Sequence, residues 1–197
     1  RLTAHSTPVI LRRRGRPSQL FFTNTGDGIS SLDPNTGRLI WRANVFPERA
    51  VGSPCVAGDL VLGICGKGGR GTLLAAVPID GRGEVTIEKA AWTSKINLPY
   101  VPTPLAFGKF LYLWGDNGVV CCVESATGKE VWTNRIGGIF STSPVCVDGK
   151  LYCISRAGEV VVLATGPEFK LLGRSGLGEG CHGTPAVANG RMIIRGF

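Results

Sequence analysis

Long apolar runs are missing from this 197-residue sequence, and none approaches the roughly 18 to 20 residues of a membrane-spanning helix. Integral membrane proteins built from α-helices are therefore excluded. Charged residues are also scarce, since Asp, Glu, Lys and Arg make up 18% of the chain while hydrophobic residues make up 43%. Because a disordered chain has the opposite balance, we expect a packed domain.

A Met start and an apolar leader are missing as well, because the sequence opens on Arg1-Leu2-Thr3-Ala4. We expect that a leader has been removed or that the start of the polypeptide lies outside this segment. Metal-binding spacings are absent too. The seven cysteines and two histidines form neither a Cys-x-x-Cys pair nor a zinc-type Cys/His pattern. We therefore predict free buried thiols and no metal site.

Acidic residues are fewer than basic ones, since the chain has 14 Asp and Glu and 22 Lys and Arg, which gives a net charge of +8. Only Arg12, Arg13, Arg14 and Arg16 form a basic cluster, between two apolar segments that we expect to be strands. A solvated loop is favoured there over a polyanion site, since a nucleic-acid groove interleaves cations with aromatic rings on one face. We expect no nucleic-acid partner.

Glycine and proline are abundant, with 29 and 12 residues, and their spacing reveals a repeat. Each copy opens on Ser/Thr-Pro and an apolar segment, followed by a turn glycine and a second apolar segment, which is a hairpin signal. Further glycine turns lead into a third and a fourth segment. The opening pairs are Thr7-Pro8, Ser53-Pro54, Thr103-Pro104, Ser143-Pro144 and Thr184-Pro185.

Four short strands in about 40 to 50 residues match one blade of a β-propeller. A four-stranded sheet cannot bury both of its faces alone, so neighbouring blades cover one another. We predict an all-β propeller of four-stranded antiparallel blades, with about four and a half blades in one partial domain over 1–197. The blades cover about 6–41, 53–92, 103–135 and 143–174, and a fifth begins at 182.

Three tryptophans stand near the ends of the predicted outermost strands, where a large flat ring would fill the widening gap between blades. Trp41 and Trp132 follow a Thr-Gly turn by four residues, and Trp92 serves a blade without that turn. In the fourth blade we expect Phe169 or Leu172 to fill the gap. These tryptophans are therefore predicted to be structural.

The repeat resembles that of the pyrroloquinoline-quinone-like (PQQ-like) propellers, which runs Ser-Pro-apolar, Gly-Lys-apolar-Tyr, a glycine turn and apolar-Asp-x-x-Thr-Gly-x-x-x-Trp. Its closest copies are Leu32 to Trp41 and Val123 to Trp132. The resemblance covers nearly the whole chain. Relatives include quinoprotein dehydrogenases, an outer-membrane barrel-assembly lipoprotein and many secreted proteins, so the resemblance implies a periplasmic or secreted location but no single function.

Seven or eight blades are implied by the same resemblance, which amounts to about 280 to 320 residues. We therefore expect this chain to be a piece of a longer polypeptide that supplies the remaining blades. A self-contained ring of four blades is the alternative.

The vicinal pair Cys121-Cys122 is similar to the adjacent-cysteine disulfide that some quinoprotein alcohol dehydrogenases carry beside their cofactor. Here the pair lies within a predicted strand, where successive side chains point to opposite faces, so two buried thiols are favoured over a disulfide. The calcium and quinone ligands of such enzymes would be acidic and amide side chains at the central funnel. The clearest acids, Asp33, Asp116 and Asp148, instead have predicted turn roles.

The segments before the Ser/Thr-Pro pairs cross the face that carries the central funnel. Two of them hold the histidines at equivalent places, and for each a polar loop role is favoured, with ligand contact at the funnel mouth as the alternative. Neither histidine has an evident carboxylate or nucleophile partner in the sequence, so no catalytic residue is predicted. The ligand-facing candidates are His5, Arg49, Tyr100, Ser141 and His182.

We therefore predict a non-catalytic propeller, without a cofactor, that binds a protein or another extended ligand through its inter-blade loops. The alternative is part of an oxidoreductase that depends on pyrroloquinoline quinone and calcium, with its catalytic ligands in blades outside this segment.

Overall fold

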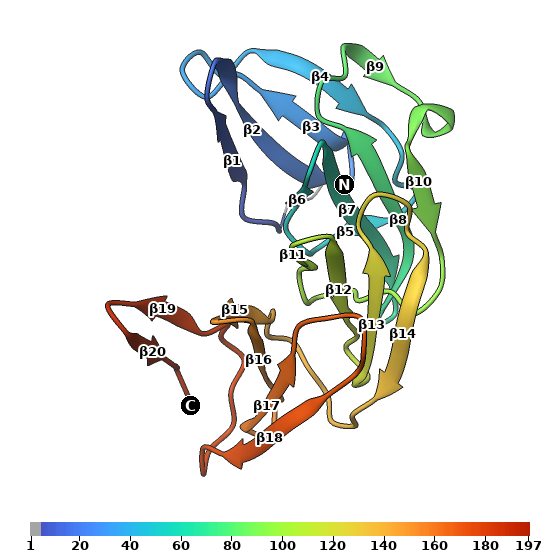
Figure 1. Ribbon diagram of the computed structural model, residues 1–197. Coiled ribbons are helices and arrows are strands. Elements are labelled where there is room, and N and C mark those ends of the chain that lie inside the picture. The colour runs from blue at the N-terminus through green and yellow to red at the C-terminus, as the bar shows by residue number, and fades with distance from the viewer. Residues whose placement is uncertain (1–4) are drawn as a thin grey trace.

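The computed structural model describes residues 5–197, which form four β-sheets and a final hairpin arranged in an arc (Figure 1). The first strand of each sheet lies on the concave side of the arc, and the last strands lie on the convex side. Helical structure in this part of the chain is limited to one 3-10 turn, η1 (Ile87–Lys89). None of its helical segments is long or apolar enough to cross a membrane. The predicted all-β propeller fold is confirmed.

The third and fourth sheets are regular four-stranded antiparallel blades. Their first hairpins are closed by two-residue turns, and in the fourth sheet Asp148 and Gly149 have φ of 48° and 69°. Positive φ at both central residues suits the right-handed twist of the two strands. The third sheet contains β11 (Leu105–Phe107), β12 (Phe110–Trp114), β13 (Val119–Glu124) and β14 (Glu130–Arg135), and the fourth contains β15 (Val145–Val147), β16 (Lys150–Ile154), β17 (Glu159–Ala164) and β18 (Leu171–Gly176).

One segment of the second repeat joins the first sheet, which the sequence did not indicate. Residues 83–85, within the segment assigned to the second blade, form β9 and pair in parallel with β4 of the first sheet. This extra strand begins at the last residue of the glycine-rich stretch 80–83, which replaces the usual Thr-Gly turn. The first sheet runs β1 (Val9–Arg13), β2 (Arg16–Asn24), β3 (Gly28–Leu32), β4 (Leu39–Ala43) and β9 (Gly83–Val85).

The second sheet is built around one long hairpin, β7 (Leu60–Lys67) and β8 (Arg70–Pro78). On its inner side β7 pairs first with β6 (Cys55–Ala57) and then with β5 (Arg49–Ala50), while β10 (Trp92–Ser94) pairs with β8 on the outer side. The chain ends in a hairpin of β19 (Ala186–Ala188) and β20 (Arg191–Ile193).

Three apolar clusters fill the spaces between successive sheets. Strand β13 shows how one sheet supplies two of them, because Cys121 belongs to the cluster shared with the second sheet and Cys122 to the cluster shared with the fourth. This is the alternation expected of a strand that is buried on both faces. The two cysteines therefore pack on opposite sides of the sheet, and both are free thiols.

Each of the three predicted tryptophans ties its sheet to the next one by a hydrogen bond. The indole N–H donates to a backbone carbonyl beyond the third strand of the following sheet, with an Nε1–O distance of 3.1 Å in every case. Trp41 is fully buried and Trp132 is 8% exposed. In the fourth sheet, Phe169 packs edge-on against Trp132 with ring centroids 5.4 Å apart, while Leu172 is exposed. The pairs are Trp41–Ile79, Trp92–Ser125 and Trp132–Gly166.

A second set of inter-sheet hydrogen bonds explains the Ser/Thr-Pro repeat. In each of the first four copies, the backbone N–H of the Ser or Thr donates to the side-chain hydroxyl of the equivalent residue in the next copy. We call this series the hydroxyl relay. Its N–O distances are 2.9 to 3.0 Å, and its links are Thr7 to Ser53, Ser53 to Thr103, Thr103 to Ser143 and Ser143 to Thr184.

We expect Gly128→Ala to destabilise the protein more than Gly37→Ala. Both glycines close Thr-Gly turns with nearly the same positive φ, +72° and +70°, so both substitutions cost about 1 kcal/mol of backbone strain. A Cβ at Gly128 would also overlap the Trp92 ring, whereas one at Gly37 would meet open space. Urea unfolding should show an extra loss of about 1 to 3 kcal/mol for Gly128→Ala. Equal losses would contradict the described packing of Trp92.

The hydroxyl relay predicts that Thr103→Val destabilises the protein while Thr103→Ser does not. Valine keeps the shape of threonine but removes the acceptor of the Ser53 N–H, which is left unpaired at a part-buried position. The expected loss is about 1 to 2 kcal/mol in the free energy of unfolding. Denaturation of the two variants side by side is the measurement, and a serine variant as unstable as the valine variant would show that the hydroxyl is not the important group.

Candidate functional site

One face of the arc is formed by the segments that connect successive sheets together with the turns between second and third strands. Backbone hydrogen bonds join the two kinds of loop, as in Phe140 N to Asp116 O and Cys181 N to Arg156 O. We call this surface the connection face. It comprises the connections 44–52, 95–102, 136–142 and 177–183 and the turns 25–27, 68–69, 115–118 and 155–158.

Two of the five candidate ligand-facing residues are brought together on the connection face. Arg49 donates from Nε to the Tyr100 hydroxyl at 2.8 Å, and its guanidinium lies 5.8 Å from the centre of the Tyr100 ring. Tyr100 is 8% exposed, so its ring is a fixed wall, while Arg49 is exposed. On this face, the contact of Arg49 with Tyr100 therefore joins the second sheet to the segment that leads into the third sheet, with a cation held over a buried aromatic ring.

Asp116 holds the same connecting segment from the third sheet. Its carboxylate accepts the N–H of Tyr100 at 2.6 Å and the N–H of Val101 at 3.2 Å. Burial raises the pKa of Asp116, and these two amide donors work in the opposite direction. The sequence predicted a turn role for Asp116 but not this contact, because the partners lie 15 and 16 residues away along the chain.

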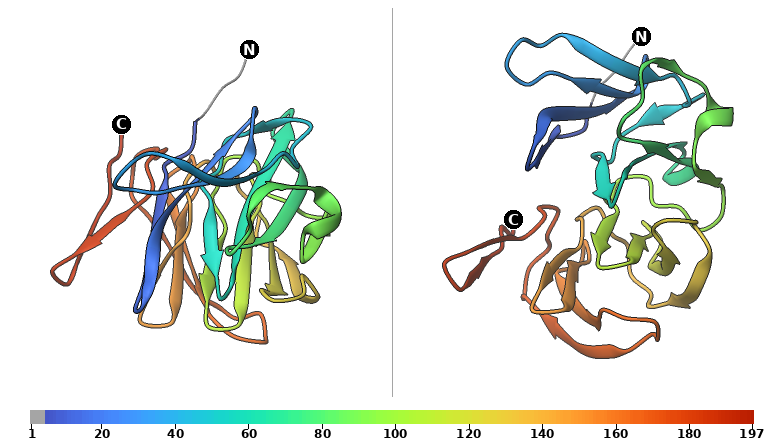
Figure 2. Two further views of the ribbon diagram at one scale, coloured as in Figure 1. Left: turned by 90° about the horizontal axis from the view of Figure 1, so that it is seen from above. Right: turned by 45° about the horizontal axis from the view of Figure 1, so that its top comes forward.

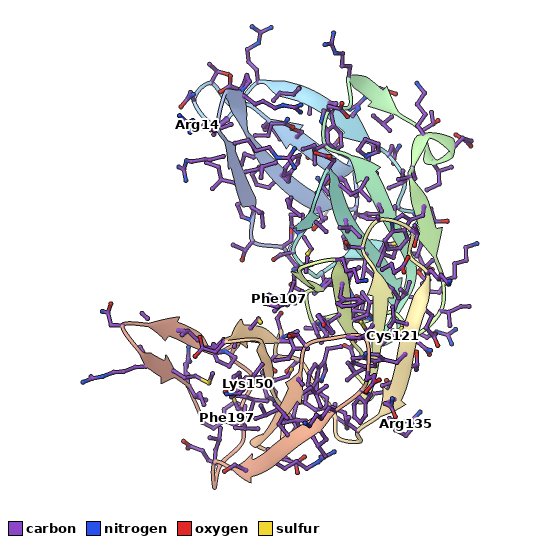
Figure 3. All side chains as sticks on the ribbon, viewed as in Figure 1. Arg14, Phe107, Cys121, Arg135, Lys150 and Phe197 are labelled. Carbon is purple, nitrogen blue, oxygen red and sulfur yellow. The ribbon has the colours of Figure 1, made fainter. Side chains whose placement is uncertain are left out.

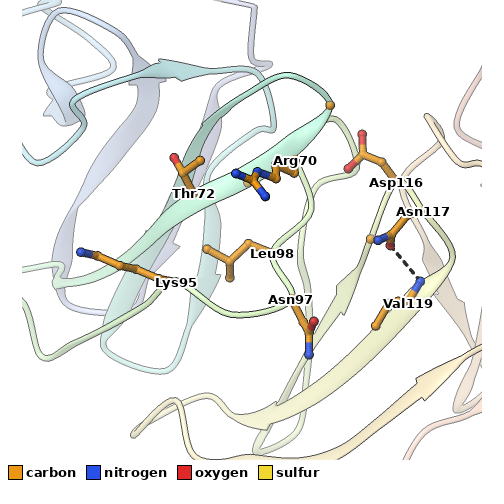
Figure 4. A pocket seen from close by; sticks show the side chains of 11 residues that line it. Arg70, Thr72, Lys95, Asn97, Leu98, Asp116, Asn117 and Val119 are labelled. Carbon is orange, nitrogen blue, oxygen red and sulfur yellow. Dashed lines mark hydrogen bonds between the residues drawn. The ribbon is translucent and has the colours of Figure 1, made fainter.

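A cavity of about 410 Å³ opens beside this link, between the second and third sheets (Figure 4). Its wall is mainly polar, with Leu98 as an apolar side chain among the polar ones. Two cations, Arg70 and Lys95, line it and form no ion pair with any residue in 5–197. The other polar lining side chains are Thr72, Asn97, Asp116 and Asn117.

A neighbouring carboxylate, Glu48, already has partners within the protein. Glu48 forms an ion pair with Lys67 at 2.6 Å and accepts a hydrogen bond from the Thr72 hydroxyl. The Lys67 ammonium, followed by the Thr72 hydroxyl, lowers the pKa of Glu48. The charge of Arg70 also lowers the pKa of Glu48, but the two side chains form no ion pair, so Arg70 and Lys95 can still bind a ligand in the cavity. The cavity thus suits an acidic or strongly hydrogen-bonding group.

The three remaining candidates form no hydrogen bond or ring contact with Arg49 or Tyr100. His5 is exposed, and His182 packs edge-on against Phe197 with ring centroids 4.8 Å apart. The Ser141 hydroxyl is buried and, within residues 5–197, has no hydrogen-bond partner. Within residues 5–197 neither histidine forms an ion pair with a carboxylate, so the arrangement does not indicate an acid–base catalyst. The sequence did not predict that Arg70, Lys95 and Asn97 would meet. The glycine-rich stretch 66–71 was interpreted as a blade turn in preference to a phosphate loop, and it lies 24 residues or more before Lys95.

The buried cysteines are held in the thiol form. Burial raises the pKa of Cys122 and of Cys153 to about 12 in each case, and that of Cys55 to about 11. A neutral thiol is a poor nucleophile and a poor metal ligand. Among residues 5–197, no group of three or more His, Cys, Asp or Glu side chains is placed to hold a metal ion.

Comparison with known proteins gives a consistent picture. Residues 82–167 match the family described as outer membrane protein assembly factor BamB. A protein of that name from Burkholderia pseudomallei (strain K96243) is 29% identical over 155 residues, which cover 77% of this chain and 40% of the relative. Another from Legionella pneumophila (strain Paris) is 26% identical over 207 residues, covering 98% of this chain and 48% of the relative. The chain therefore spans about half the length of the curated relatives it matches.

Solved structures agree on the fold. The crystal structure of BamB from Moraxella catarrhalis superposes with a TM-score of 0.71 at 18% identity, covering 96% of this chain and 54% of that one. The computationally designed protein Ika8 superposes with a TM-score of 0.67 at 10% identity, covering 94% and 54%. These likenesses show the fold alone. Together with the family match, they confirm the PQQ-like repeat predicted from the sequence.

We expect Asp116→Asn to loosen the connection between the second and third sheets. An amide offers one acceptor oxygen where the carboxylate offers two, so the Tyr100 or Val101 N–H loses its partner. Native-state hydrogen exchange should then be at least tenfold faster at these two amides, corresponding to roughly 1.4 kcal/mol. The control is Asp33→Asn, since Asp33 accepts only from its own turn; unchanged exchange in Asp116→Asn would refute the assigned role.

Proposed function

We propose that this chain of PQQ-like propeller repeats is a non-catalytic binding module that takes part in the assembly of outer-membrane proteins, on the periplasmic side of that membrane. The observation that carries the proposal is the cavity on the connection face. It combines Arg70 and Lys95, which form no ion pair within residues 5–197, with Asp116, whose carboxylate fixes the connecting segment at Tyr100. We infer that a protein segment with an acidic side chain binds there.

The relatives support the biological setting of this proposal. The family that residues 82–167 match, and the Burkholderia and Legionella relatives, carry the name outer membrane protein assembly factor. That name concerns proteins about twice as long as this chain. The assembly role, the periplasmic location and the protein partner are therefore our proposals for this chain.

The chemistry of the described residues favours binding over catalysis. A nucleophilic mechanism needs a nucleophile and a base within hydrogen-bond reach. The buried cysteines have raised pKa values, and the two histidines have no carboxylate partner among residues 5–197. The quinone-dependent alternative gains no support here, because Cys121 and Cys122 are free thiols in separate apolar clusters.

The connection face is also built in the way that protein interfaces require. Its backbone is fixed by hydrogen bonds between loops of different sheets, so little conformational entropy is lost when a partner binds. Arg and Tyr, which are enriched at the energetically important positions of interfaces, stand side by side at Arg49 and Tyr100.

The test reverses the two cavity charges. In the source organism, replacing the native gene with one that encodes Arg70→Glu and Lys95→Glu should lower the amount of folded β-barrel proteins in the outer membrane, because two acidic groups repel an acidic segment. The matched control is Lys89→Glu with Lys129→Glu, which makes the same charge change at exposed positions outside the cavity.

Semi-native electrophoresis of outer-membrane porins measures the folded amount. Normal porin levels in the cavity variant, with the variant protein present at its usual abundance, would contradict the proposed function. Equal loss in the control variant would show that overall charge, and not the cavity, is responsible.

A further inference from the structure

The face opposite the connection face is formed by the turns that join the first two strands of each sheet, together with the turns that follow the third strands. The two kinds of turn are hydrogen-bonded, as in Ser125 N to Lys109 O and Thr165 N to Gly149 O. Figure 2, left, shows these hairpin ends along the lower edge of the molecule. Neighbouring turns are in contact, because Arg13 donates to the Gly58 carbonyl and pairs with Asp59 at 2.6 Å. Strand β11 likewise lies beside β6 and β15. We call the inner part of this side, formed by the turns between first and second strands, the inner-turn face. Its turns are residues 14–15, 58–59, 108–109, 148–149 and 189–190.

On this side of the molecule the excess positive charge lies at the inner turns, since the turns after the third strands carry acids such as Asp33 and Glu124. Seven basic and two acidic residues lie in the inner turns or within two residues of them, a net charge of +5 out of +8 for the whole chain. The acids are Asp59, which is paired with Arg13, and Asp148. Six basic side chains are exposed and form no ion pair within residues 5–197: Arg12, Arg14, Arg16, Lys109, Lys150 and Arg191.

Apolar side chains are exposed among these cations. Phe107, directly before the turn of the third sheet, is 45% exposed, and Val187 in the last hairpin is also 45% exposed. Figure 3 shows Arg14 at the tip of the first hairpin, with Phe107 and Lys150 on the third and fourth sheets. Basic residues interspersed with a few exposed apolar side chains are typical of surfaces that lie on a membrane.

We propose that the inner-turn face binds the surface of a bilayer that contains anionic phospholipids. The six cations stand on four separate hairpins and do not converge on one point, and none of them lines the cavity of the connection face or either of two further cavities in residues 5–197. A lipid surface offers many mobile negative headgroups, which can match such a spread of long side chains. A single acidic peptide would need a groove.

This inference goes beyond the proposed function, because it concerns other residues on the opposite face. The cations act by long-range attraction, so binding should weaken as the salt concentration rises. The sequence favoured a solvated loop for the arginine cluster. It could not show that Lys109, Lys150 and Arg191, from later repeats, join the cluster on one surface.

Co-sedimentation of the purified protein with lipid vesicles tests the proposal. We expect binding to vesicles of equimolar phosphatidylglycerol and phosphatidylcholine, and none to vesicles of phosphatidylcholine alone. The triple variant Arg14→Gln, Lys109→Gln and Lys150→Gln should bind the anionic vesicles roughly a hundredfold more weakly, since each basic residue near such a surface contributes about fivefold.

The control variant Lys89→Gln, Arg135→Gln and Arg195→Gln removes the same charge from exposed positions away from the inner turns. Circular dichroism establishes that both variants retain the parent fold. An equal loss in the two variants, or absence of binding by the parent protein, would overturn the proposal. Binding to polyglutamate but not to the anionic vesicles would assign the face to an acidic protein and would also overturn it.

Discussion

The arrangement of the sheets depends on the backbone N–H that precedes each inner strand, because this group finds its hydrogen-bond acceptor in the next sheet and not in its own. The residue before a proline is held in an extended conformation, and the proline that follows has no N–H of its own. The amide of the Ser or Thr therefore points out of its own sheet and needs an acceptor from elsewhere. The hydroxyl of the next Ser/Thr-Pro pair supplies it, as in the bond from Ser53 to Thr103. The same residue type thus serves as donor to one neighbour and acceptor from the other, which fixes the spacing of the inner strands.

The tryptophan bonds do on the convex side what the hydroxyl relay does on the concave side. Trp132 donates to Gly166 O, and Gly166 N in turn donates to the Tyr112 hydroxyl, so side chains of the third sheet engage one turn of the fourth sheet at two atoms. Burial of Tyr112 raises its pKa to about 12, so it remains a neutral partner for this turn. With both edges of a sheet tied to its neighbour, the apolar cluster between them is closed at both ends.

Much of this fold could be predicted from the sequence, because the blade is a local unit. Hairpins follow from glycine turns such as Asp148-Gly149, and the burial of Trp41 follows from its place after a Thr-Gly turn. The pairing of β9 with the first sheet and the contact of Asp116 with Tyr100 could not be predicted, since both join segments of different repeats. The candidate site has the same limitation. Arg49 and Tyr100 were identified because they lie close to Val51 and Val101, the positions equivalent to the histidines in the repeat. Arg70 and Lys95 lie near no such position.

The two proposed surfaces are separated by the strands themselves. A five-residue strand such as β12 spans about 17 Å from its inner turn to the connection face. Its turn at Gly108-Lys109 has two residues and leaves no slack, and its other end leads directly into Asp116. The strand that presents Lys109 to one side therefore positions the carboxylate that holds Tyr100 on the other. Because the relay and the tryptophan bonds prevent the sheets from sliding past one another, a partner at the cavity and a membrane at the inner turns would be held at a fixed separation and orientation.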